Sequence, residues 1–172
     1  GSSGRLVVGN IAASGGTTSS GIGGAGGTIT LTSTGDYLNI SGVVTSRGAT
    51  GSSGEGTAGN FGLIVLNGAA SQTNNSGLHA VNVGHLRVQA LNASSFLDTN
   101  NTADYIAANI TGSGQAFTYL SAANYSIGGG VTNVTGIATQ GGDVILSNSA
   151  VVISATESIT TLGGNFTANN IG

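Results

Sequence analysis

The chain has 172 residues, of which 32 are glycine and only 5% are charged, with a formal net charge of −3. A chain so poor in cations lacks the basic surface that binds nucleic acid. The absence of cysteine excludes a disulfide scaffold and argues against a zinc site. No apolar run approaches the roughly 20 residues of a membrane helix. Because 38% of the residues are hydrophobic, we expect the chain to fold, and because it has no long apolar run we expect no membrane insertion.

Alternation of apolar and polar side chains with a period of two recurs along the chain, and it predicts short β-strands. In chain order, the clearest segments are TITLT at 28–32, DYLNIS at 36–41, GVVTS at 42–46, HLRVQAL at 85–91 and GGDVILS at 141–147. Side chains on one face of these strands are expected to point inward and to stack as an apolar ladder. The inward ladder is Ile29, Leu31, Leu38, Ile40, Leu86, Val88, Val144 and Leu146.

Glycine pairs precede three of the strand segments and indicate sharp corners. Residues 26–41 and 141–156 share one order, which is glycine pair, strand, polar turn, strand. This likeness indicates a degenerate internal repeat of about twenty residues per unit. Glycine is suited to such corners because it adopts positive φ without steric cost. The predicted corner glycines are Gly26, Gly27, Gly141, Gly142, Gly163 and Gly164.

Short strands between glycine corners predict an all-β fold, a β-solenoid whose neighbouring coils pair in parallel. A single domain over residues 1–172 would contain roughly eight coils, with surface loops near 12–25 and 67–80. We expect this domain to be a segment of a longer rod or a polymerising subunit. The alternative fold is an antiparallel sandwich with a hairpin at Asn67-Gly68.

Residues 106–147, IAANITGSGQAFTYLSAANYSIGGGVTNVTGIATQGGDVILS, resemble the repeats of large filamentous-haemagglutinin-like surface proteins of bacteria. The resemblance implies a single-stranded right-handed parallel β-helix, secretion or display at the cell surface, and a role in cell adhesion or as a structural fibre. The matching positions are Ile106 to Ala108, Thr111, Gly112, Gly114, Phe117, Tyr119, Ile127, Gly128, Val134, Gly136, Ile137 and Gly141 to Val144.

Residues that could carry chemistry are few, and none forms a specific motif. Residues 95–110, which we interpret as a loop followed by a strand, place oxygen ligands from Asp98 to Asp104 at alternate positions, but the turn glycine and final glutamate of a calcium loop are missing. His79 and His85 have no acidic neighbour in sequence. We therefore predict no enzyme, no catalytic residue, no metal site and no cofactor. A glycosidase would need two of the chain's carboxylates to lie close together. The six available are Asp36, Glu55, Asp98, Asp104, Asp143 and Glu157.

The sequence thus predicts an extracellular or bacterial cell-surface rod. One hypothesis is a structural and adhesive segment of a bacterial adhesin of filamentous-haemagglutinin type. The alternative is a subunit of a self-assembling extracellular filament that stacks end to end, because neither end of the sequence shows the charged cap that blunts a solenoid edge. The expected partners are neighbouring coils or identical subunits, and glycans or proteins of a host or cell surface.

Overall fold

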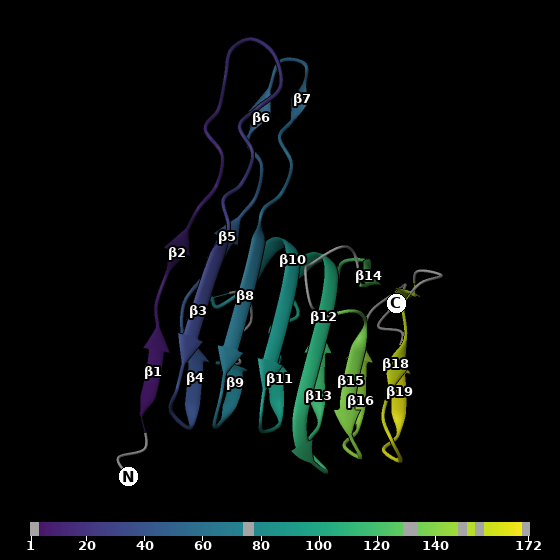
Figure 1. The fold of residues 1–172 in the computed structure, drawn as a ribbon. Coiled ribbons are helices and arrows are strands. Elements are labelled where there is room, and N and C mark those ends of the chain that lie inside the picture. Colours follow the sequence, from purple (N-terminus) through teal and green to yellow (C-terminus); the bar gives the residue numbers. More distant parts are fainter. Residues whose placement is uncertain (1–3, 74–77, 129–133, 148–150, 154–156, 170–172) are drawn as a thin grey trace.

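The computed structural model describes residues 4–73, 78–128, 134–147, 151–153 and 157–169. Over these residues the regular structure is all β, with two large parallel sheets and one small antiparallel pair of strands (Figure 1). The all-β class and the parallel pairing that the sequence predicted are confirmed. The antiparallel sandwich is wrong, because the strands on either side of Asn67-Gly68 belong to different sheets.

One large sheet has seven strands, and their order across the sheet follows their order along the chain. All neighbouring strands in it pair in parallel. The strands are β1 (Arg5–Val8), β4 (Tyr37–Ile40), β9 (Ala69–Gln72), β11 (Ser94–Phe96), β13 (Phe117–Leu120), β16 (Val144–Ser147) and β19 (Phe166–Asn169).

The other large sheet has ten strands, and two long strands hold it together. β10 (Val81–Ala90) and β12 (Thr102–Ser113) pair with each other over most of their length. Shorter strands continue the sheet on either side of the two long ones. These are β2 (Ile11–Ala12), β3 (Ile29–Ser33), β5 (Val44–Ser46), β8 (Asn60–Val65), β14 (Tyr125–Ile127), β15 (Ile137–Gln140), β17 (Val151–Ile153) and β18 (Ile159–Thr160).

The chain visits the two large sheets alternately, and we call each course from one strand of the seven-stranded sheet to the next a pass. The first step between paired residues is 32 positions, from Arg5 to Tyr37, and the last is 22, from Val144 to Phe166. These steps exceed the expected twenty residues, so the described chain crosses this sheet seven times rather than eight.

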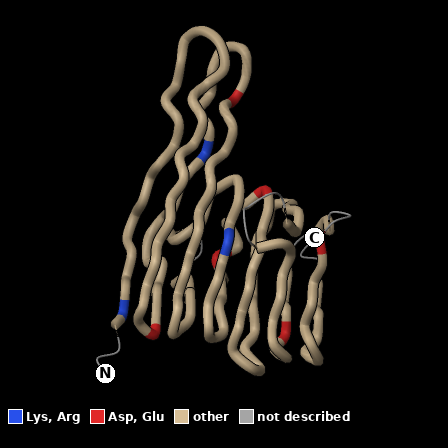
Figure 2. The backbone as a smooth tube through the Cα atoms, in the orientation of Figure 1, with Lys and Arg blue, Asp and Glu red and all other residues tan. Residues whose placement is uncertain are grey.

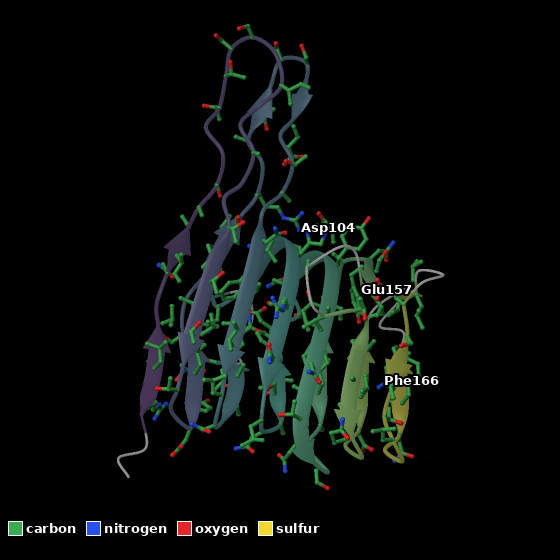
Figure 3. The ribbon with its side chains drawn as sticks, in the orientation of Figure 1. Asp104, Glu157 and Phe166 are labelled. Carbon is green, nitrogen blue, oxygen red and sulfur yellow. The ribbon has the colours of Figure 1, made fainter. Side chains whose placement is uncertain are left out.

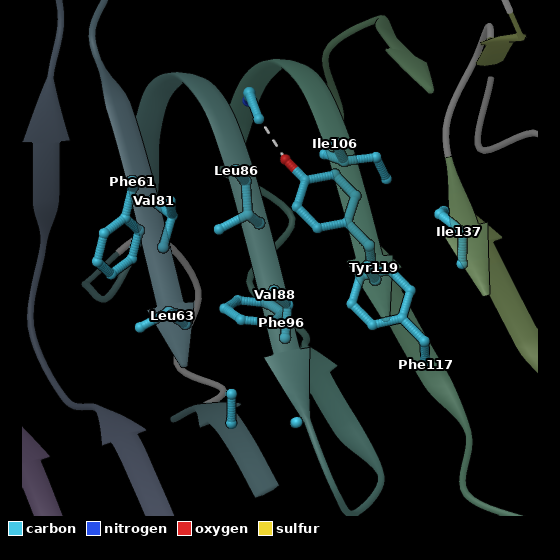
Figure 4. Packing of buried hydrophobic residues seen from close by; sticks show 14 of the residues in the cluster. Phe61, Leu63, Val81, Leu86, Val88, Phe96, Ile106, Phe117, Tyr119 and Ile137 are labelled. Carbon is cyan, nitrogen blue, oxygen red and sulfur yellow. Dashed lines mark hydrogen bonds between the residues drawn. The ribbon is translucent and has the colours of Figure 1, made fainter. Parts of the chain in front are cut away.

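Apolar side chains from both large sheets meet in one core (Figure 4). Of the eight residues of the expected inward ladder, seven are buried and Leu31 packs partly buried against them. Tyr119 lies in the same core, and its hydroxyl oxygen accepts a hydrogen bond from the Ala103 N–H at 3.3 Å. The period-two alternation places these side chains because successive residues of a strand face opposite sides.

Two segments leave the sheets together and form a narrow structure that we call the glycine projection, residues 13–28 and 47–59 (Figure 1). The antiparallel strands β6 (Thr50–Gly51) and β7 (Gly54–Glu55) lie in it. Backbone hydrogen bonds join its segments, with Gly15 N donating to Arg47 O and Ala49 N donating to Gly24 O, both at 2.9 Å. A Cβ atom added at Gly15 would overlap the carbonyl oxygen of Gly24, so the backbones lie too close for side chains.

Two details of the sequence prediction are wrong. The expected loop at 67–80 contains β9, whose small and polar residues gave no apolar alternation, although Ala70 and Gln72 point inward. Of the expected corner glycines, Gly141 and Gly163 have the positive φ of a corner, at 84° and 111°. Gly26 does not have a positive φ. Glycine is needed there because an added Cβ atom would lie 2.8 Å from the backbone carbonyl oxygen of Ser46.

Two adjacent glycines allow the packing of the projection to be tested. Gly15→Ala places a methyl group against the Gly24 carbonyl, whereas a Cβ at Gly16 meets nothing within 4 Å. We expect Gly15→Ala to speed amide hydrogen exchange at Gly24 and Ala49 by about tenfold or more, and Gly16→Ala to leave it unchanged or slower. NMR-detected exchange on the whole chain measures both. Equal behaviour of the two variants would contradict the close backbone packing.

Candidate functional site

Charged side chains are sparse and widely separated on the fold (Figure 2). Among the described residues one salt bridge forms, between Arg47 and Asp104 at 2.7 Å, and Arg47 also donates to the carbonyl of Thr102. Because Arg47 follows β5 and Asp104 lies on β12, the pair crosses over the intervening strand β10. An exposed ion pair of this kind adds little stability, so we interpret it as a contact that links separate passes.

A buried polar cluster lies at the turn between β11 and β12. Asp98 and Asn101 are fully buried, and Gln72 is 4% exposed. Asn101 donates to the Gln72 side-chain oxygen at 3.0 Å and accepts from the backbone of Val81 at 2.8 Å. Asp98 accepts from the backbone of Asn100 at 2.9 Å. The cluster satisfies buried backbone groups where the chain turns, which is a structural task.

The residues of the hypothetical calcium loop do not converge. Asp98 points into the buried cluster, whereas Asp104 lies exposed on β12 beside Arg47 (Figure 3). No three histidine or acidic side chains within the described part of the chain gather closely enough to hold a metal ion.

The two histidines lie in different surroundings. His79 precedes β10, where its backbone N–H donates to Asp98 at 3.3 Å. His85 lies on β10, and its ring stacks on the ring of Tyr105 with the centroids 4.8 Å apart and the planes 11° from parallel. The sequence gave no sign of this stacked pair, because it depends on the register between β10 and β12.

Burial raises the pKa of two tyrosines in the core well above the ordinary value for a phenol, because the charged form would be desolvated. The rings of Tyr119 and Tyr125 meet edge to face with centroids 5.0 Å apart. Tyr119 accepts the backbone hydrogen bond from Ala103, whereas the buried Tyr125 hydroxyl has no hydrogen-bond partner in the described structure.

The last pass leaves apolar side chains uncovered. Phe166 follows Phe117 and Val144 in one inward row, in which the earlier two are fully buried and Phe166 is 46% exposed (Figure 3). Val152 and Ile153 on β17 are also exposed. At the other end, inward residues of the first pass, such as Leu6, are only partly buried. Both end passes therefore present sheet edges and apolar side chains to whatever lies beyond them.

None of the described residues forms a helix that is long and apolar enough to cross a membrane. Comparison with family models, with curated proteins and with solved structures found no match.

The two core tyrosines provide a matched pair of variants. Tyr125→Phe removes a buried hydroxyl without a partner, so we expect unfolding free energy to stay equal or to rise by up to about 1 kcal/mol. Tyr119→Phe leaves the buried Ala103 N–H without its acceptor, so we expect a loss of about 1–2 kcal/mol. Urea denaturation measures both values. A larger loss from Tyr125→Phe than from Tyr119→Phe would contradict this assignment.

Proposed function

We propose that the chain is a β-solenoid segment of an extracellular structural and adhesive rod, of filamentous-haemagglutinin type, displayed at a bacterial cell surface. The proposal assigns it no catalytic role and no cofactor. Its partners would be adjoining coils and the glycans or proteins of a facing surface.

The observation that carries the proposal is the pairing between passes. In the seven-stranded sheet each strand pairs in parallel with the strand of the next pass, as Arg5 pairs with Tyr37 and Tyr37 with Ala69. Such a fold can be lengthened by adding passes without redesigning the core, because each pass contacts only its neighbours. Crossover connections between parallel strands are right-handed almost without exception, so a right-handed coil is the expected hand.

Polar side chains support the same interpretation on the outside. On the seven-stranded sheet, the Asn39 amide donates to Thr73 at 2.9 Å, and Ser71 donates to Asn39 at 3.1 Å. These bonds run between passes, so uncharged side chains add to the cohesion of the stack. A long, stiff and chemically inert body is what a rod that spans the space outside a cell requires.

End-to-end assembly of copies is the second candidate, since a second copy could cover the exposed end passes as further passes of a longer chain would. Phe166 and Ile153 at one end and the partly covered Leu6 at the other would be buried by the end pass of a second copy. Open parallel edges of this kind accept further strands. The rod would then be built from many copies instead of from one long chain.

Engineered disulfides test the solenoid, because the chain has no natural cysteine. Thr118 and Ile145 are parallel partners on adjacent passes, at about 5 Å between Cα atoms, which suits a disulfide. Thr118 and Ser71 lie two passes apart, at about 10 Å, which does not. We expect Thr118→Cys with Ile145→Cys to oxidise to an intramolecular bond and Thr118→Cys with Ser71→Cys to stay reduced, as measured by mass spectrometry. The reverse result overturns the solenoid.

Sedimentation and negative-stain microscopy over a concentration series separate the two rod hypotheses. Fibres would establish the filament if Phe166→Lys abolishes them and Thr167→Lys, at the outward-facing neighbouring residue, leaves them intact. Monomers at every concentration would support the adhesin segment. A closed dimer that neither variant disturbs would contradict both candidates, since it would leave no end for a further pass.

A further inference from the structure

A small hollow lies on the outer surface of the ten-stranded sheet, over β8 and between β3 of the first pass and β10. Its volume is about 160 Å³. Gly62 opens it, because this residue carries no side chain between Thr30 and Arg87, its register partners on the two neighbouring strands. The residues that line it include Thr28, Thr30, Asn60, Gly62, Ile64 and Arg87.

The guanidinium of Arg87 at this hollow has most of its hydrogen-bonding capacity unused. Its Nη2 donates to the side-chain oxygen of Gln89 at 3.3 Å, and its buried Nε has no hydrogen-bond partner in the described structure. A guanidinium has five N–H donors in a fork that matches a carboxylate. Among the described residues, Arg87 forms no salt bridge, whereas the other two arginines meet a carboxylate and a tyrosine ring.

The side chains beside Arg87 suit the hydroxyl groups and ring faces of a sugar. Asn60 and Thr30 line the hollow, and their amide and hydroxyl groups both donate and accept. His85, in register with Asn60 and two residues before Arg87 on the same face of β10, carries the stacked ring of Tyr105. A few polar groups placed around one charged group can orient a small polar ligand, and the His85 and Tyr105 rings lie beside the hollow and are not part of its lining.

Position in the sheet argues against a peptide ligand. The hollow lies over β8, which pairs with β3 on one side and with β10 on the other. An extended peptide is generally captured by pairing with an open sheet edge, and the open edge here is the far side of β3, whereas the hollow lies over β8. The net charge of −3 argues against a polyanion, so the ligand should bring one carboxylate to one arginine.

We propose that this hollow binds a carboxylate-bearing saccharide. Arg87 pairs with the carboxylate, Asn60 and Thr30 bind hydroxyl groups, and the His85–Tyr105 pair contacts the sugar ring. The inference rests on the proposed function, since it gives the adhesive rod the chemical class of its ligand.

NMR titration of the whole chain tests the site directly, with the Arg87 Nε–H signal as reporter. The probes carry one carboxylate each and are galacturonate, a hyaluronan disaccharide and 3′-sialyllactose, beside the methyl ester of the first, the carboxyl-reduced form of the second, and lactose. We expect at least one acidic saccharide to shift the Arg87 signal with a Kd of about 1 mM, weakening as NaCl is added, and its neutral counterpart to bind at least tenfold more weakly.

Three variants locate the binding. Arg87→Gln should abolish it, and Arg5→Gln, which changes an arginine on the other sheet, should leave it intact. Gly62→Val should block the hollow without strain, because a Cβ there lies an ordinary 3.8 Å from Thr30 Oγ1. The amide spectrum of each variant reports whether it folds.

Three results would overturn the proposal. The first is the absence of any Arg87 shift with all three acidic saccharides at 10-fold the expected Kd, about 10 mM. The second is binding that survives both Arg87→Gln and Gly62→Val. The third is an acetylated glutamate peptide that binds as tightly as the best saccharide, which would replace the sugar with a protein ligand. The disulfide pairs on the other sheet are independent of all three, so a failed titration leaves the solenoid test standing.

Discussion

The constraint on which this structure depends is that each pass must lie in register beside the one before it. Parallel backbone pairing fixes neighbouring residues side by side, and a slip by one residue would turn every inward side chain outward. A single inward position therefore continues through the whole seven-stranded sheet, from pass to pass. That row is Leu6, Leu38, Ala70, Ser94, Phe117, Val144 and Phe166.

Two other features are consequences of the same constraint. A row of stacked side chains is uncovered at both ends, so Phe166 stays half exposed and Leu6 is only partly buried, while the five members between them are buried. In the glycine projection the backbones continue to pair beyond the core, where no apolar interior exists to receive side chains. Glycine at positions such as Gly15 removes the side chains and lets the backbones approach each other. One pairing rule thus produces a ladder where side chains alternate and a thin projection where they are missing.

Sequence patterns predicted what is local to a strand and missed what depends on distant passes. Alternation in HLRVQAL was sufficient to turn Leu86 and Val88 inward, and both are buried. β9 was missed because AASQ has no apolar alternation, and its strand state comes from pairing with β4, 32 residues earlier. The hollow at Gly62 was equally invisible, since it needs Thr30 and Arg87 to arrive in register from two other passes. Lengths of the loops between passes vary, and no repeat of constant period reveals that register.

The position of the hollow separates the two tasks proposed for this chain. Its residues come from β3, β8 and β10, all within the first three passes, while the exposed row of the last pass ends at Phe166 on β19. A further pass added beyond β19 buries Phe166 and leaves Arg87 untouched, because each pass meets only its neighbours. Binding and elongation therefore make no competing demands on the same side chains. A rod built this way would lengthen at the β19 end and leave the hollow at Arg87 unchanged, because β10 lies several passes away from that end.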